Sequence, residues 1–177
     1  MIGLLAATQA EAAPLVERLE ATGLTQTPFR TFGFAAKGRR PRGVIIIGGM
    51  GKDAAARAVA HMVTDLEVTR VINVGICGAL SAEIPVGEIR AVTRVSDGDQ
   101  ILAGADGPAV SFCCEGWPGL SSSRLVTVHQ PVFESDRRKT LAQQAELVDM
   151  EGLAAAEACA KYGVPCCLLK GVSDLAD

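Results

Sequence analysis

Apolar residues along this chain fall into two patterns, short continuous runs and recurrences at helical spacing. Residues 2–7 form a short apolar run, and after it Ala12, Leu15 and Leu19 recur at helical intervals within residues 9–22. A continuous run of this length is typical of a buried strand, whereas the wider spacing is typical of an amphipathic helix. The start of the chain therefore predicts a strand, a tight turn and a helix.

The same two patterns alternate along the rest of the sequence. The segment GRRPRG at residues 38–43 predicts the turn of a hairpin, and residues 103–122, which have no clear period, predict a loop. Strands are predicted at 29–37, 43–49, 70–75, 88–95, 124–128 and 165–172, and helices at 52–66, 134–144 and 150–161. Strands that alternate with helices predict a single α/β domain over residues 1–177, with a mixed or largely parallel central sheet.

The composition supports a folded domain and argues against two classes of function. Apolar residues make up 49% of the 177 residues, aromatic residues only 4%, and the mean hydropathy is +0.27. That much apolar surface can offset the entropy of ordering the chain. The longest strongly apolar run, near residues 44–50, is far shorter than the ~20 residues that a membrane span needs. With 17 basic and 20 acidic residues the net charge is −3, so a nucleic-acid-binding surface is not indicated.

The six cysteines indicate a reducing compartment. None belongs to a CxxC pair, and four form two adjacent doublets, Cys113 with Cys114 and Cys166 with Cys167. Neither zinc sites nor the disulfide frameworks of secreted proteins have this pattern. The N-terminus carries no basic segment before its apolar run, so we interpret it as a strand and not as a signal peptide. We therefore expect a cytoplasmic protein with free, mostly buried thiols and no bound metal.

Four polar or glycine-rich segments follow predicted strands and are candidates for a functional site. They are residues 7–11, 48–52 and 73–79, and the pair 148–151 and 171–177. In α/β sheets the ligand crevice lies beyond the carboxyl ends of the strands, where these segments are expected to meet. Each also has a purely structural interpretation. Glu11 or Asp174 would be the polar start of a helix, and the glycines would form turns without a ligand.

Spacing within these segments refines the expectation. A glycine turn before a helix, such as residues 48–52, exposes N–H groups to an anion, although this one is neither a dinucleotide fingerprint nor a P-loop. Asp149 and Glu151 are two positions apart and would point to different sides of a helix, so only one is expected to face the crevice. Asp174 follows an apolar strand, where a buried carboxyl group needs a partner or a task.

The four segments, in this order, resemble the purine nucleoside phosphorylase superfamily. The resemblance runs along the whole chain and is most specific where MEG at 150–152 is followed by VSDLAD at 172–177. ATQAEAAPL, IGGMGKDAAARA, NVGICGAL and VGEI also match. The chain is similar to the branch that holds methylthioadenosine/adenosylhomocysteine nucleosidases and hopanoid-associated, nucleosidase-like phosphorylases. The resemblance implies a three-layer fold with a mixed central sheet flanked by helices, and cleavage of the N-glycosidic bond of a purine nucleoside.

The resemblance also implies roles for individual residues. Glu11 takes the place of the acidic residue that orients the attacking water, and Asp174 that of the acid that protonates the purine, with Ser173 holding it. Met150 and Glu151 match a pair in which the Met packs under the ribose and the Glu binds its hydroxyl groups. Such carboxyl groups suit the reaction, because the breaking bond leaves positive charge on the ribose and negative charge on the base.

Gly51, Gly75 and Ile76, in the two glycine turns, complete the predicted substrate-binding residues. Ile76 stands where the family often has Ser or Thr, a feature of the hopanoid-associated branch, and Lys170 stands where an arginine is usual. An arginine offers a planar fork of donors that a lysine lacks. Family members usually continue through a further helix beyond the position of Asp177, and we expect the domain to lack it.

The expected reaction is hydrolysis of a nucleoside of the 5′-methylthioadenosine/S-adenosylhomocysteine type, by a homodimer and without a metal or organic cofactor. Two alternatives stay open at this point. One is phosphorolysis of an adenosine adduct such as an adenosyl hopanoid, with phosphate as co-substrate, and the other is a homologue that binds a nucleoside without turning it over. Phe112, Trp117 or Phe133 would stack on the purine or pack in the core. His129 is expected either near the base or at the surface.

Overall fold

The computed structural model describes residues 1–35 and 41–175, and a mixed sheet of ten strands forms the centre of this part of the chain. The strands are β1 (Ile2–Ala6), β2 (Thr22–Thr25), β3 (Arg30–Ala35), β4 (Pro41–Ile47), β5 (Arg70–Ala79), β6 (Ile89–Asp97), β7 (Ser111–Cys113), β8 (Ser122–Thr127), β9 (Leu147–Asp149) and β10 (Cys166–Asp174). Their order in the sheet is β10-β6-β8-β9-β5-β1-β4-β3-β2, and β7 pairs with β6.

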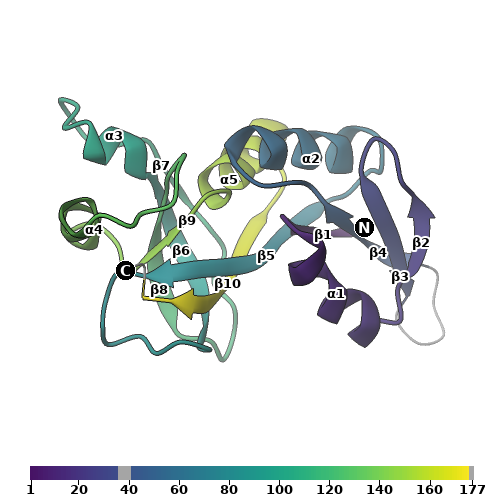
Figure 1. Ribbon diagram of the computed structural model, residues 1–177. Helices are drawn as coiled ribbons and strands as arrows, with labels where there is room; N and C mark the ends of the chain where they lie inside the picture. The colour runs from purple at the N-terminus through teal and green to yellow at the C-terminus, as the bar shows by residue number, and fades with distance from the viewer. Residues whose placement is uncertain (36–40, 176–177) are drawn as a thin grey trace.

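Helices cover both faces of this sheet. Those in the described residues are α1 (Gln9–Arg18), α2 (Lys52–Thr64), α3 (Gly98–Leu102), α4 (Ser135–Ala142) and α5 (Gly152–Tyr162). In Figure 1, α2 and α5 lie together on one side of the sheet and α1 lies on the other, while α3 and α4 lie at the end opposite β2 and β3. The predicted three-layer α/β arrangement with a mixed central sheet is confirmed.

The strands of the first half of the chain form a layer that is buried on both faces. β1 runs parallel to β4 and to β5, with Ile2 opposite both Gly43 and Arg70. Leu5 and Ile45, near the middle of this layer, are at most 1% exposed. Continuous apolar runs of this kind are typical of parallel strands that are covered on both sides. The antiparallel strands β3 and β2 then extend the sheet to its edge.

The longest strand, β5, belongs to two parts of the sheet at once. Its first residues pair with β1, nearly its whole length pairs in parallel with β10, and Gly78 and Ala79 at its end pair with β9. Since β10 also pairs with β6, β6 with β8, and β8 with β9, these five strands close into a ring. The closure brings the carboxyl ends of β5 and β10 together, with Gly78 opposite Asp174.

Small side chains let the two helices above the sheet approach each other closely. α2 and α5 are in contact, and the residues they bury include Ala55 and Ala58 in α2 and Ala155 in α5. α5 is capped after Tyr162 by Gly163, whose φ of 66° lies in the left-handed region that glycine adopts without strain. The packing fixes the first residues of α2 and of α5, and both helices begin beside the cavity described below.

Most of the predicted elements are confirmed, and the differences concern short or strongly paired segments. β5 continues to Ala79, past its predicted end at Gly75, because pairing with β10 and β9 extends it. The predicted loop at 103–122 contains β7. β2, α3 and β9 were not predicted, because they have three to five residues each, too few to display a hydrophobic period.

Two further predictions concern the hairpin turn and the possibility of a membrane-spanning segment. The antiparallel pairing of β3 with β4 confirms the predicted hairpin, whereas Gly38, Arg39 and Arg40 in its turn lie outside the described residues, as do Ala176 and Asp177. No helix in residues 1–35 or 41–175 has the length and apolar character needed to cross a membrane.

Candidate active site

A cavity of about 480 Å³ opens where β1, β5 and β10 end. Its volume lies within the usual range for small-molecule sites. Six of the predicted site residues line it, namely Glu11, Ile76, Met150, Glu151, Ser173 and Asp174. The other two, Gly51 and Gly75, are not part of the lining but contact the carboxylates that are. The structure therefore brings the three predicted carboxyl groups together, although they are far apart in the sequence.

Glu11 is held by donors from two separate segments. Its Oε2 accepts the backbone N–H of Thr8 at 2.7 Å and the Thr8 hydroxyl at 2.9 Å, while its own N–H donates to Thr8 Oγ1 in a capping box. Its Oε1 accepts the N–H of Ile76 on β5 at 3.0 Å. Glu11 thus does have the structural role at the start of a helix that its sequence position suggested. The bond to Ile76 goes beyond capping, because it fixes the carboxylate against the end of β5.

Gly75 is required by the close approach of Glu11. A Cβ atom at this position would lie 2.9 Å from Glu11 Oε1 and 3.5 Å from Lys170 Nζ. The first of these distances is shorter than van der Waals contact allows, so any side chain here would displace the carboxylate. The glycine predicted from the sequence therefore makes room for Glu11 and does not itself line the cavity.

The glycine turn before α2 binds a carboxylate of the protein itself, the side chain of Glu151. Gly51, with φ of 90°, is the N-cap of α2, and its N–H donates to Glu151 Oε1 at 2.7 Å. Glu151 is itself the N-cap of α5 and is 9% exposed. Burial raises the pKa of the Glu151 carboxyl group above its ordinary value; the bond from Gly51 opposes this rise, and the charge of Asp149 adds to it.

A buried ion pair lies next to the part of the cavity that Glu151 lines. Lys170 Nζ is 2.7 Å from Asp149 Oδ2, and both side chains are 1% exposed. Asp149 also accepts the Thr127 hydroxyl at 2.6 Å and the Gly152 N–H at 2.9 Å, and Thr127 Oγ1 in turn accepts the N–H of Leu153. Burial alone would lower the pKa of Lys170, but the charge of Asp149 and the contact with it outweigh burial and raise that pKa.

The pair of acids at the start of α5 differs from the expectation based on helical spacing. Asp149 and Glu151 both border the cavity, because Asp149 lies in β9 and Glu151 caps the helix, so neither is inside a helix. Asp149 is engaged by Lys170 and Thr127, whereas Glu151 is engaged by one backbone N–H from Gly51. Thr127 was not among the predicted site residues. The sequence shows it only as a polar residue near the end of a predicted strand.

Asp174 is the last residue of β10 and lines the cavity. The β10–β5 register shifts between Val172 and Asp174, so the strand bends as it reaches the cavity. The Ser173 hydroxyl is 2.6 Å from Asp174 Oδ2 and 3.2 Å from the carbonyl oxygen of Cys77. One hydroxyl hydrogen serves one acceptor at a time. When Ser173 donates to the carbonyl oxygen of Cys77, its own oxygen can accept a hydrogen bond from a protonated Asp174 carboxyl group.

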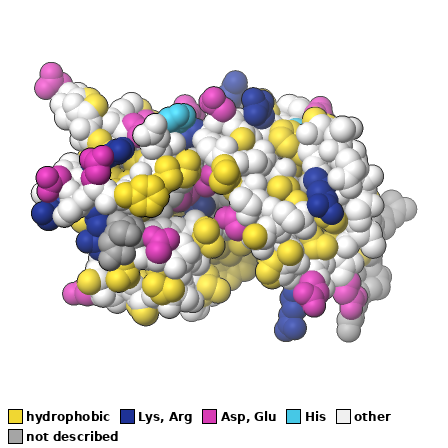
Figure 2. All heavy atoms as spheres, in the orientation of Figure 1, with side chains coloured by type: hydrophobic (Ala, Val, Ile, Leu, Met, Phe, Trp, Pro, Cys, Tyr) yellow, Lys and Arg dark blue, Asp and Glu magenta, His cyan; other side chains and the backbone are white. Residues whose placement is uncertain are grey.

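Apolar side chains form the mouth of the cavity. Met50, Ile76 and Phe133 all line it and are 70%, 59% and 78% exposed. Apolar side chains gather over the middle of the face in Figure 2, with acidic side chains between them. Among the three aromatic residues considered for stacking, Phe133 lines this cavity, whereas Phe112 borders a different one.

Metal binding and thiol chemistry are two further possibilities for a site of this kind. The described residues contain no group of three or more His, Cys, Asp and Glu side chains placed to hold a metal ion. Cys77 lines the cavity, but burial raises the pKa of its thiol to about 12. A thiol with such a pKa is protonated at neutral pH and is a poor nucleophile. Carboxyl groups are thus the reactive groups that the cavity offers.

Comparison with known proteins places this arrangement in a family. The family described as the Phosphorylase superfamily matches residues 1–121 and 120–177, which is the whole chain. The chain belongs to this superfamily. The resemblance noted from the four segments is therefore confirmed, and it extends over the strands that form both the N-terminal layer and the ring.

Similar members of the superfamily are nucleosidases. The aminodeoxyfutalosine nucleosidase of Helicobacter pylori (strain J99) is 25% identical over 99% of this chain and 86% of its own length. A 5′-methylthioadenosine/S-adenosylhomocysteine nucleosidase of Colwellia psychrerythraea is 28% identical over 98% of this chain and 83% of its own length. A crystal structure of the Helicobacter pylori 5′-methylthioadenosine/S-adenosylhomocysteine nucleosidase, complexed with a pyrrolidine compound, matches this chain with a TM-score of 0.89 at 22% identity. The match covers 99% of this chain and 85% of that chain.

Proposed function

We propose that this superfamily member is a nucleosidase that hydrolyses the N-glycosidic bond of a purine nucleoside, of the 5′-methylthioadenosine/S-adenosylhomocysteine type, to free base and a ribose product. The observation that carries the proposal is the convergence of Glu11, Glu151 and Asp174 on one cavity of nucleoside size. The names of the relatives support it, since they are nucleosidases.

Asp174 is the general acid in this proposal. As the bond between C1′ and the purine breaks, its electron pair moves onto the base, and protonation of the base makes it a better leaving group. Asp174 gives its proton to the purine nitrogen that faces it. Ser173 is placed to hold the carboxyl group through both protonation states, because its hydroxyl can donate to Asp174 or accept from it.

Glu11 is the base that activates water. A carboxylate has about four acceptor positions, and Glu11 uses three of them for Thr8 and Ile76. A water molecule that donates to the remaining position is aimed at the anomeric carbon of a ribose in the cavity. The water oxygen bonds to C1′ as the purine leaves, and the proton of the water passes to Glu11, so that protons and electrons balance.

Glu151 and Met150 hold the sugar. The N–H of Gly51 donates to one oxygen of Glu151, and in this proposal the second oxygen accepts ribose hydroxyl groups. A carboxylate beside the ribose also stabilises the positive charge that develops there in the transition state. Met150 supplies an apolar surface next to it, suited to packing under the sugar ring.

Electrostatics favour water over phosphate as the nucleophile. Glu11, Asp149 and Glu151 border the same cavity, and the buried cation Lys170 is already paired with Asp149. A phosphate dianion would therefore meet carboxylates with little compensating charge. The turn at Gly51, which could bind an anion, already binds Glu151. The chain's own residues thus support hydrolysis without phosphate, and the proposal needs neither a metal nor an organic cofactor.

The proposal is tested with Asp174→Asn and Glu11→Gln. Adenosine-type nucleosides are incubated with each protein, with and without phosphate, and free base is measured by chromatography. We expect Asp174→Asn to lower kcat by roughly 10²–10⁴, the usual contribution of a general acid, and to leave adenine binding nearly unchanged. Glu11→Gln should be comparably damaging, because an amide cannot accept a proton from water.

Matched controls are available for both substitutions. Glu17→Gln changes an exposed residue of the same helix as Glu11, and Asp106→Asn changes an exposed aspartate remote from the cavity lining. Both should keep wild-type activity. Equal activity of all the variants would refute the roles given to Glu11 and Asp174. Activity that needs phosphate and survives Glu11→Gln would show phosphorolysis instead.

We also propose that the protein is a homodimer of the cytoplasm. Met50, Ile76 and Phe133 expose an apolar rim around the cavity, and a second copy of the chain would cover it. All six cysteines are free thiols, as expected in a reducing compartment. Light scattering at micromolar concentration tests the first point, because a monomeric mass would contradict it. Fractionation of the native cells, with the protein detected by antibody, tests the second.

A further inference from the structure

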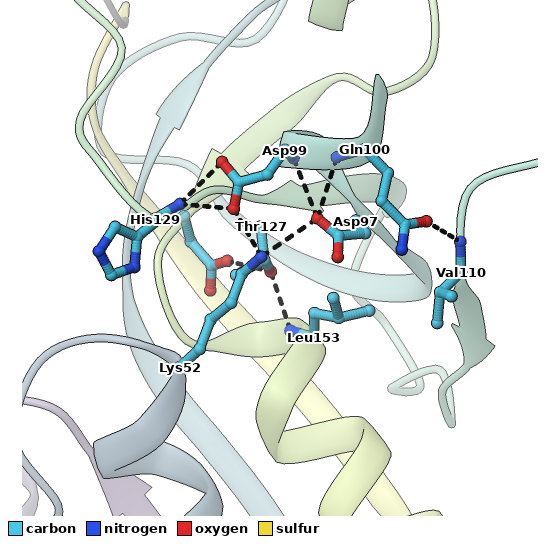
Figure 3. Close-up of polar contacts among 9 residues, drawn as sticks. Lys52, Asp97, Asp99, Gln100, Val110, Thr127, His129 and Leu153 are labelled. Atoms are coloured by element: carbon cyan, nitrogen blue, oxygen red, sulfur yellow. Dashed lines mark hydrogen bonds and ion pairs between the residues drawn. The ribbon is translucent and has the colours of Figure 1, made fainter. Parts of the chain in front are cut away.

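A second ionic cluster lies beside the cavity but outside its lining. Lys52 Nζ is 3.1 Å from Asp97 Oδ1 and 2.7 Å from Asp99 Oδ2. Figure 3 shows the lysine reaching from the start of α2 toward two aspartates at the start of α3. None of the three residues borders the cavity, so the reaction proposed above does not use them.

The position of Asp99 is fixed from within its own short helix. Asp97 is the N-cap of α3, and its Oδ1 accepts the backbone N–H of Asp99 at 3.0 Å. The same oxygen contacts Lys52. Asp97 therefore orders the first turn of α3 and leaves the Asp99 side chain directed toward its partners on other elements.

Asp99 binds the loop that forms the apolar wall of the cavity. The backbone N–H of His129 lies 3.1 Å from Oδ1 and 3.0 Å from Oδ2 of Asp99, so it is shared between the two oxygens. The His129 ring points away from this contact in Figure 3. The next residues of the loop include Pro131, Val132 and Phe133, which line the cavity. A bond to the backbone at His129 thus places the start of that wall.

Lys52 is connected to a second part of the cavity wall by its position in the sequence. It is the first residue of α2 and directly follows Gly51, whose N–H holds Glu151. The preceding residue, Met50, lines the mouth. Lys52 and Asp99 together therefore connect the turn that orients Glu151 to the loop that carries Phe133.

We propose that Asp99 and Lys52 are positioning residues, which clamp the loop at 128–133 to the start of α2 and thereby set the apolar wall against which the nucleoside binds. The inference rests on the proposed function for its kinetic consequence, but the clamp itself is a structural statement. Removing the clamp should weaken binding of substrate and base while leaving Glu11 and Asp174, the reacting groups, in place.

The surroundings of Asp99 and Lys52 keep both groups of the clamp in their charged forms. Burial alone would raise the pKa of Asp99, but the bonds from Lys52 and from the His129 N–H outweigh burial and lower it. Burial would likewise lower the pKa of Lys52, but its bonds to Asp99 and Asp97 raise it. Both groups are therefore charged across the neutral range, and the bonds that they make are charge-assisted.

The test uses Asp99→Asn and Lys52→Met in the full chain. Asparagine keeps the size of the side chain but turns one acceptor into a donor, so it cannot accept from both His129 and Lys52 in the same way. We expect KM for the nucleoside and Kd for adenine to rise roughly tenfold in either variant, with kcat changed by less than about threefold. The double variant should be little worse than either single variant, because the two residues act as a unit.

A matched control comes from a pair of the same construction on another surface. Glu146 accepts the backbone N–H of Arg124 at 2.7 Å and pairs with its guanidinium group, but neither residue borders the cavity. Glu146→Gln should leave KM and adenine binding at wild-type values. If Glu146→Gln raised KM as much as Asp99→Asn does, the effect would be general loosening of the fold and the clamp would be refuted.

Hydrogen exchange separates the clamp from the proposed function. The backbone N–H groups of residues 128–130, 132 and 133 should exchange faster in Asp99→Asn than in the wild type, whatever reaction the protein catalyses. A wild-type protein that cleaves no nucleoside would refute the proposed function and leave this measurement valid. Unchanged exchange at 128–133 in both variants would overturn the clamp, even if the enzyme proves to be a nucleosidase.

Discussion

Lys170 and Lys52 both pair with carboxylates near the cavity, but the two pairs differ in their exposure to solvent. Lys170 and its partner Asp149 are each 1% exposed, inside the ring of strands. The side chain of Lys52 is 22% exposed and that of its partner Asp99 is 38% exposed, so this pair is in contact with solvent. The same kind of ion pair is therefore found once with almost no solvent and once in contact with it.

The difference in burial decides what each pair can do. Removing one member of a buried pair leaves a charge without compensation, which costs about 3–5 kcal/mol, whereas an exposed pair is worth about 0–1 kcal/mol. The pair at Lys170 is thus expected to determine whether this part of the fold forms. The pair at Lys52 is expected to affect where a loop lies, with little effect on the free energy of unfolding.

The largest effect is expected from Lys170→Met. Methionine keeps much of the side-chain volume but leaves the Asp149 carboxylate buried beside Glu151. We expect the free energy of unfolding to fall by about 3–5 kcal/mol, measured by urea denaturation at pH 7. Adding Asp149→Asn should restore part of the loss, because the amide is neutral and can still accept from Thr127. A single variant as stable as the wild type would contradict the importance of this pair.

An intermediate effect is expected from Glu151→Gln, which removes a buried charge and keeps an acceptor for Gly51. Burial raises the pKa of Glu151 above the ordinary 4.5, so the folded state holds this proton more tightly than the unfolded chain does. The wild type therefore gains stability as the pH falls through the folded pKa toward 4.5, and the charged carboxylate lowers its stability at pH 7. The variant should consequently melt at a higher temperature than the wild type at pH 7.

This pH dependence gives the experiment its own control. Each kcal/mol gained corresponds to a rise in Tm of about 2–4 °C for a chain of this size. Below pH 4 both proteins carry a neutral group at this position, so the difference in Tm should disappear. A difference that stays constant between pH 4 and pH 7 would mean that the charge of Glu151 is not its cause.

The smallest effect on stability is expected from Lys52→Met, which removes the cation of the partly exposed pair with Asp99. We expect a loss of at most about 1 kcal/mol in the free energy of unfolding, and a smaller loss in high salt, which screens exposed charges. The measurement is urea denaturation of both proteins at low and high salt. A loss as large as that of Lys170→Met would remove the distinction between the two lysines.

The sequence was sufficient to predict the fold class and the meeting of Glu11, Glu151 and Asp174. The hydrophobic pattern shows apolar strands that alternate with helices. Polar residues that follow the strands are expected at the one crevice of an α/β sheet. The matching motifs then selected these three carboxyl groups from others of equal standing. Their placement on one cavity is observed, while their roles in the reaction stay predictions.

Other parts of the site could not be predicted from the sequence, because they depend on contacts between distant short elements. Asp149 lies in a strand of three residues, and its partner Thr127 is 22 positions earlier in the chain. Asp99 lies in a helix of five residues, 30 positions from its partner His129. No hydrophobic period extends over such short segments, and the pairing of two polar side chains leaves no pattern in the sequence between them.

The ring of five strands has a consequence for the accuracy with which Asp174 is placed. Side chains alternate across a strand, so a slip of one residue would turn every side chain of β10 to the opposite face. β10 is hydrogen-bonded on one edge to β5 and on the other to β6, and both neighbours are tied to each other through the remaining strands. A slip would therefore have to break two ladders at once. The topology of the ring, and not the strength of any single contact, therefore fixes how far along the strand axis the Asp174 carboxyl group lies.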